Sequence, residues 1–99
     1  MDVSIIRGGG MAGIATRTQL ASDALPKDAS RRLRELASAV APADDAAGRH
    51  PDETLYKVEV NGLIATYTET TLPEPVRALI AFVDERPERQ DALEPPRRR

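Results

Sequence analysis

The sequence predicts an α+β fold in which two β-hairpins are each followed by a helix, in the order ββαββα. Three observations predict it: two pairs of β-rich segments, turn residues between the members of each pair, and an apolar stripe at helical spacing after each pair. We expect a four-stranded antiparallel sheet with both helices packed on one face, where the apolar stripes are buried. We expect one domain at residues 1–86 and a disordered, charged tail at residues 87–99.

The first expected hairpin joins residues 3–7 to residues 14–20. Residues 3–7 are short, rich in β-branched side chains and roughly alternating, which is typical of a strand. The second segment places a set of apolar and β-branched side chains on one side, namely Ile14, Thr16, Thr18 and Leu20. The glycine-rich stretch between them predicts a hairpin with a loop at its tip.

The first expected helix begins at Pro26, whose fixed φ and missing N–H do no harm at the first helical position. Asp28 favours the first turn through the helix dipole. The apolar positions recur at spacings of three and four, as Ala29, Leu33, Leu36, Ala37 and Val40. Residues 41–52 are small, charged or helix-breaking, so we expect a linker there.

The second hairpin has the strongest local signal in the chain. Asn61 and Gly62 stand between two alternating β-rich segments, residues 54–60 and 63–68, and both residue types tolerate φ > 0. A two-residue turn pairs six side chains that then share one face, which we assign to the core: Tyr56, Val58, Val60, Leu63, Ala65 and Tyr67.

The second helix is expected to follow a capping box, with Thr71 as the cap and Glu74 three residues later. Its apolar stripe consists of Val76, Leu79, Ile80 and Val83, with Phe82 beside it. The helix should end near Pro87. From there to the end of the chain, one apolar pair stands among charges and three prolines, and such a composition does not bury enough surface to order itself.

Several classes of function are excluded by composition. The 99 residues contain no cysteine and one histidine, His50, so no conventional zinc site, metal cofactor or thiol nucleophile is expected. There is no nucleophile beside a base and no pair of motif-placed carboxylates, so we expect no catalytic residues and no enzyme. A net charge of −2 produces no strong electrostatic field that would attract the protein to nucleic acid or membrane lipid. No signal peptide is visible, so we expect a cytoplasmic protein, with export by another route left open.

The glycine-rich loop is the candidate site, and it comprises Gly8, Gly9, Gly10, Met11, Ala12 and Gly13. Four glycines within six positions are more than a tight turn requires, because a two-residue turn connects two strands equally well. Met11 is unbranched and polarizable and fills irregular apolar pockets. Two interpretations stay open: a flexible hairpin tip with Met11 folded onto the core, or a loop that presents Met11 and bare backbone to a protein partner.

The order of these segments resembles the emfourin family, small bacterial inhibitors of protealysin and related thermolysin-like metallopeptidases. The resemblance rests on Gly-Gly-x-Ala-Gly-Ile at residues 9–14, Asp-Ala-Leu-Pro at 23–26, Tyr-x-Val-x-Val at 56–60, and the Leu-Pro-x-x-Val-Arg-x-Leu-Ile segment at 72–80. It covers about residues 1–85 and leaves the tail unmatched. The family often places Phe where this chain has Met11, and this loop carries an extra glycine; both departures bear on potency and target choice.

The resemblance implies an inhibitor, monomeric when free, that blocks the active-site cleft of a thermolysin-like peptidase without being cut. Met11 would fill an apolar pocket, and the glycines would let the main chain approach closely. No residue is an obvious zinc ligand, so the resemblance favours blockade of the cleft over removal of the zinc. Two alternatives stay open: an adaptor or toxin-neutralising module that uses the same loop on an unrelated protein, and a purely structural domain.

Overall fold

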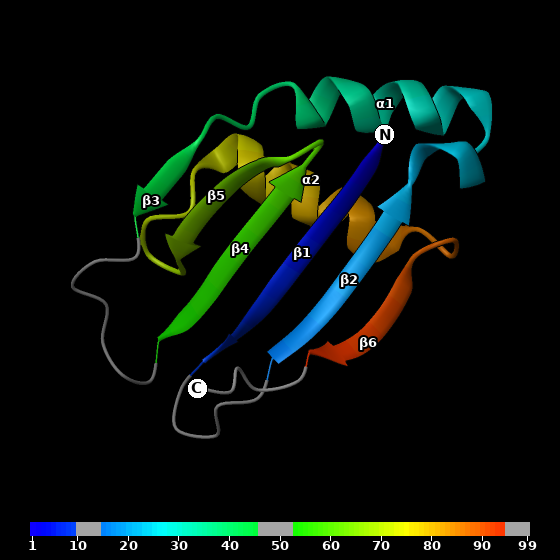
Figure 1. Ribbon diagram of the computed structural model, residues 1–99. Helices are drawn as coiled ribbons and strands as arrows, with labels where there is room; N and C mark the ends of the chain where they lie inside the picture. The colour runs from blue at the N-terminus through cyan, green and yellow to red at the C-terminus, as the bar shows by residue number, and fades with distance from the viewer. Residues whose placement is uncertain (10–14, 46–52, 95–99) are drawn as a thin grey trace.

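The computed structural model describes residues 1–9, 15–45 and 53–94. Within these residues, two α-helices and six strands follow one another (Figure 1). In order, the elements are β1 (Asp2–Gly9), β2 (Ala15–Ala21), the 3-10 helix η2 (Ser22–Ala24), α1 (Lys27–Ala37), β3 (Ala43–Asp45), β4 (Thr54–Val60), β5 (Leu63–Thr68), α2 (Glu74–Glu85) and β6 (Gln90–Glu94).

The strands form one mixed sheet in the order β3-β5-β4-β1-β2-β6. All neighbouring strands are antiparallel except β3 and β5, which are parallel. The prediction of a four-stranded antiparallel sheet was therefore wrong in strand number and in direction, although the two hairpins are present. The hairpins meet through β1, which pairs with β4 on one side and with β2 on the other.

The expectation of a disordered tail was wrong for β6, which pairs with β2 from Gln19 opposite Gln90 to Ala15 opposite Glu94. The side chains of residues 90–93 are all exposed, so these four residues add nothing to the core. The strand is held by backbone hydrogen bonds to β2, which any sequence without proline can form. A side-chain hydrogen bond from Thr18 Oγ1 to Asp91 Oδ1 at 2.9 Å supports the pairing. Residues 95–99 lie outside the described residues.

The expected linker at residues 41–52 also contains a strand. Ala43–Asp45 form β3, which lies parallel to β5 with Ala43 opposite Ala65. Three residues are too few for a periodic pattern to stand out, so the surrounding proline and charged residues dominated the sequence signal. Residues 46–52, including His50, lie outside the described residues, and the expectation that His50 forms no conventional zinc site stays a prediction.

The Asn-Gly turn was predicted correctly. Asn61 has φ 50° and Gly62 has φ 85°, the left-handed conformations that a two-residue hairpin turn requires. The register follows from it, with Val60 opposite Leu63 and Tyr56 opposite Tyr67. Of the six side chains assigned to the core face, four are buried and Tyr56 and Leu63 are half-buried against the core.

Both helices pack with the sheet around a single core. Figure 1 shows α2 behind the strands and α1 across the top of the view, so that the face of the sheet toward the viewer is uncovered. Leu33 of α1 and Leu79 of α2 are buried together with Ile5 and Val58 of the central strands. The expected stripe of α2 is buried at all four positions, Val76, Leu79, Ile80 and Val83, whereas Leu36 of α1 is only half-buried.

The helix starts differ from the prediction. Pro26 and Pro73 each precede the first helical residue, and their carbonyl oxygens accept bonds from the N–H groups of Ser30 and Arg77 at 2.8 and 2.9 Å. The capping box at Thr71 was wrong: the Thr71 hydroxyl accepts a hydrogen bond from the Thr68 N–H at 2.8 Å instead. Threonine hydroxyls form hydrogen bonds in turns as readily as at helix caps, and here the Thr71 hydroxyl bonds within the turn after β5.

Candidate functional site

The candidate site begins within β1. Gly8 and Gly9 are its last two residues, and Ala15 is the first residue of β2. The other predicted site residues, Gly10, Met11, Ala12 and Gly13, lie outside the described residues. The structure therefore defines the base of the loop.

The base of the loop is held by strands on both sides. Gly8 is paired with Ala15 of β2 and with Leu55 of β4, and Gly9 is paired with Thr54. Glu94 of β6 lies on the other side of Ala15. Because β1 and β2 are interior strands, the two ends of the loop are fixed by the sheet itself and not by a free edge.

Several elements end at this end of the sheet. β5 ends here, because its last residue, Thr68, is opposite Leu55 near the start of β4. β3 is parallel to β5 and ends at the same place, with Asp45 opposite Tyr67. The last turn of α2 reaches the same end, because Asp84 contacts Arg7 of β1. This end gathers segments that are far apart in the sequence.

Arg7 and Asp84 form a two-pronged ion pair beside the loop. Arg7 Nη1 donates to Asp84 Oδ2 at 3.0 Å and Nη2 donates to Oδ1 at 2.7 Å. The hydrogen bonds from the guanidinium to the Asp84 carboxylate, with the charge of that carboxylate, raise the pKa of Arg7 above its usual value. The pair borders a shallow pocket whose other lining residues are Thr16, Thr18, Arg89 and Asp91. Arg89 Nε lies 3.2 Å from Asp91 Oδ2, so the charges around this pocket are balanced.

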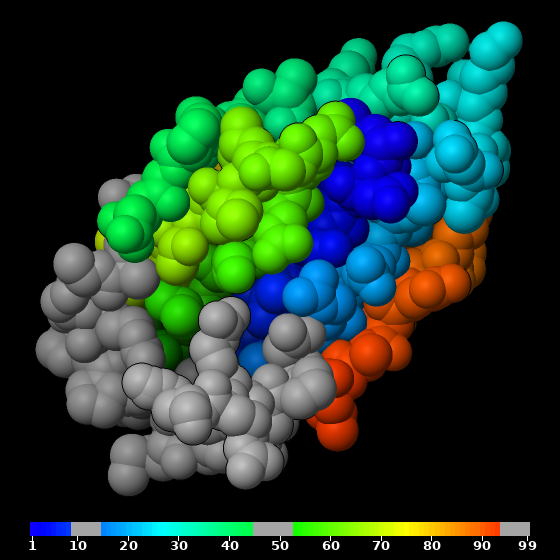
Figure 2. Space-filling model, in the orientation of Figure 1, coloured from blue at the N-terminus to red at the C-terminus, as the bar shows by residue number. Residues whose placement is uncertain are grey.

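The uncovered face of the sheet is mostly polar, although Ile64 of β5, opposite Glu59, is 47% exposed there. Arg17 of β2 and Lys57 of β4 both lie near the Glu59 carboxylate, at 3.9 and 3.6 Å. Gln19 donates to the Ser4 hydroxyl at 3.4 Å across β2 and β1. Figure 2 shows the molecule from this side, with the central strands in blue and green. Paired charges and hydrogen-bonded polar groups make this a solvated face with no concentrated charge of one sign.

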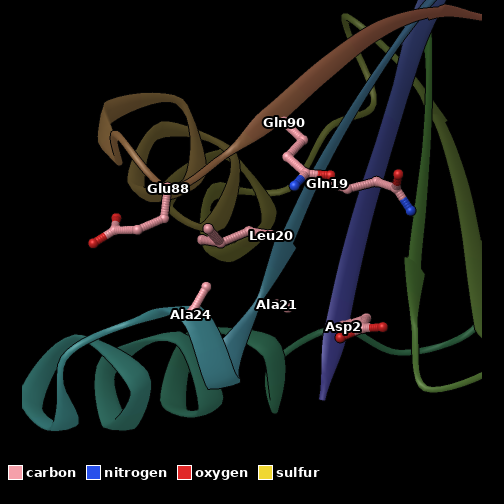
Figure 3. A pocket seen from close by; sticks show the side chains of 7 residues that line it. All are labelled: Asp2, Gln19, Leu20, Ala21, Ala24, Glu88 and Gln90. Carbon is pink, nitrogen blue, oxygen red and sulfur yellow. The ribbon is translucent and has the colours of Figure 1, made fainter.

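A pocket of about 160 Å³ lies at the opposite end of β2, away from the glycine-rich loop (Figure 3). Its walls come from β1, β2, η2 and the segment around the start of β6: Asp2, Gln19, Leu20, Ala21, Ala24, Glu88 and Gln90. Arg86 donates twice to the Glu88 carboxylate at 2.9 Å and lowers the pKa of Glu88. No nucleophile stands beside a base among these lining residues, so the pocket carries no catalytic arrangement.

Across the described parts of the chain, no group of three or more His, Cys, Asp and Glu is placed to hold a metal ion. No helix described here is long and apolar enough to cross a membrane.

The emfourin family model matches residues 5–84, more than half of the chain. The chain belongs to the emfourin family. Emfourins are proteinaceous metalloprotease inhibitors and not enzymes. No curated protein and no solved structure matches the chain. The family resemblance found in the sequence is thereby confirmed.

In this emfourin the match runs from Ile5 to Asp84 and so includes the glycine-rich loop and both members of the Arg7–Asp84 pair. It ends before β6, which is an addition to the matched part of the fold. Sequence reasoning missed the Arg7–Asp84 pair. The two residues are 77 positions apart, and no local spacing links a strand arginine to an aspartate at the end of a distant helix.

Proposed function

We propose that this emfourin inhibits a thermolysin-like zinc metallopeptidase by placing its glycine-rich loop in the active-site cleft. Membership of an inhibitor family supports the target class. The observation that carries the loop assignment is its attachment: both ends join interior strands, with Gly8 paired on two sides.

A fixed base favours binding because association costs conformational freedom. A loop whose ends are already held loses less entropy on entering a cleft than one on a free terminus. Met11 supplies an apolar side chain for a specificity pocket. Gly10 and Gly13 carry no side chain, so the peptidase can approach the main chain closely at these positions. Cleft blockade fits this composition better than zinc removal, because the loop holds no carboxylate, imidazole or thiolate.

The test is an inhibition assay with purified protein and two enzymes, thermolysin and a protealysin-type peptidase. Substrate hydrolysis should fall with inhibitor concentration, and raising the substrate concentration should relieve the inhibition, as expected for a blocked cleft. Added zinc should leave the inhibition unchanged, which distinguishes blockade from chelation. A serine peptidase of unrelated mechanism serves as the control and should stay active. Full activity of both metallopeptidases at a large excess of the protein would overturn the proposal.

A further inference from the structure

We propose that Arg7 and Asp84 are positioning residues that fix the base of the glycine-rich loop and thereby strengthen binding of the peptidase. The proposal rests on the proposed function and concerns how the same loop is held. Neither residue is assigned a contact with the peptidase.

Arg7 occupies a special position on β1. It is followed by Gly8 and Gly9, so it carries the last side chain on the strand before the loop. Glycine loses more conformational freedom on ordering than any other residue. Beyond Arg7, β1 is therefore held by its backbone pairing alone, and the final side-chain anchor of the strand is the guanidinium of Arg7.

The anchor point of this guanidinium is rigid. Asp84 lies in the last turn of α2, directly after Val83, whose side chain is fully buried in the core. Leu79, one turn earlier, is also fully buried. The two hydrogen bonds of 3.0 and 2.7 Å therefore join the end of β1 to a helix that the core holds in place.

The form of the pair favours a geometric role over a stabilising one. The side chains of Arg7 and Asp84 keep 26% and 43% of their surface exposed, and pairs in such positions contribute little to stability. Two parallel N–H···O bonds nevertheless fix the relative orientation of the groups that they join. Orientation set before binding lowers the entropy cost of association, so its loss appears in affinity more than in folding.

The experiment is a double-mutant cycle with Arg7→Met, Asp84→Asn and the double variant, each measured for peptidase inhibition and melting temperature. Each single variant should raise the inhibition constant by about tenfold, and the double variant should raise it no further, because either change removes the same constraint. The melting temperatures should stay within about 4 °C of the parent. Arg7→Lys keeps the charge without the planar fork and should fall between the parent and Arg7→Met.

Arg86, two residues after Asp84, provides a matched control. Arg86 also forms a two-pronged pair, but its partner Glu88 is only two residues away, so this pair joins no two elements of the core. Arg86→Met should inhibit like the parent. If it weakens inhibition as much as Arg7→Met, loss of any arginine is sufficient and the positioning role is wrong.

Two further outcomes would overturn the proposal. Parental inhibition by both single variants would show that the pair is irrelevant to binding. Weak inhibition by Arg7→Met together with parental inhibition by Asp84→Asn would show that Arg7 contacts the peptidase directly.

A parent protein that inhibits neither metallopeptidase would instead refute the proposed function. The role of the pair is then read from amide hydrogen exchange at Gly8 and Gly9, which should be faster in both single variants. Unchanged exchange at these amides would remove the positioning role as well.

Discussion

Glu94, the last residue of β6, is paired with Ala15, the first residue of β2. This pairing places β6 along the edge of β2 up to the base of the glycine-rich loop. An uncovered β2 would present unpaired N–H and C=O groups, which are a template for pairing with another chain. β6 therefore protects this edge although its residues 90–93 contribute nothing to the core.

Truncation after Glu85 tests this role of β6. The shortened protein should keep its fold, because no side chain of residues 90–93 is buried. Its melting temperature should fall by a few degrees, and size-exclusion chromatography should show self-association that rises with concentration. The monomeric fraction should inhibit within a few-fold of the parent. An entirely monomeric truncated protein with the parental melting temperature would show that β2 needs no cover.

Met11→Asp separates the two interpretations of the loop. If Met11 enters an apolar pocket, burying a charge there is costly, and inhibition should fall at least tenfold, about 1.4 kcal/mol. The melting temperature should stay near that of the parent. Met11→Phe should keep or improve inhibition. A lower melting temperature for Met11→Asp would instead place Met11 against the core, and a stable, fully inhibitory variant would remove the loop from the mechanism.

Leu79→Ala tests the core. Leu79 is fully buried between α2 and the sheet, and its truncation leaves a cavity, so the free energy of unfolding should fall by about 2–5 kcal/mol. Leu93→Ala is the matched control, because this leucine is 73% exposed on β6 and should change the stability by less than about 0.5 kcal/mol. Denaturant unfolding of both variants measures the difference. Equal effects would contradict the core assignment.

Gly62→Ala tests the turn. Its φ of 85° is unfavourable for a residue with a Cβ, although a Cβ there would meet no atom within 4 Å. The loss of stability should therefore be about 1–2 kcal/mol from backbone strain alone. Asn61→Gly, at φ 50°, should be nearly neutral. If Gly62→Ala matched the parent in thermal unfolding, the left-handed turn would be in doubt.

The Arg86–Glu88 pair predicts a pH effect. Hydrogen bonding to Arg86 lowers the pKa of Glu88 in the folded protein below its unfolded value. The pair therefore stabilises the fold above the unfolded pKa, and this contribution is lost as the pH falls through the folded pKa. NMR titration should find a higher Glu88 midpoint in Arg86→Met than in the parent. The same midpoint in both proteins would mean that the pair does not persist in solution.

Much of the secondary structure followed from local patterns. The Asn-Gly turn sets the register of β4 and β5 through the φ values of two adjacent residues, so a few positions suffice to predict it. The stripe of α2 has a clear period, and all four of its positions are buried. The sequence also identified the family, because motif order is readable along the chain, whereas the assignment of the glycine-rich loop as the site stays a prediction.

Tertiary structure alone decided the rest. The insertion of β1 between β4 and β2, the parallel addition of β3 and the pairing of β6 depend on backbone hydrogen bonds, which carry almost no side-chain signature. The contact between Arg7 and Asp84 depends on where α2 ends relative to β1, and 77 positions separate the two residues. Turn chemistry and helical periodicity depend on residues a few positions apart, so turns and helices can be predicted from the sequence. Strand order and long-range ion pairs arise only when the core brings distant segments together.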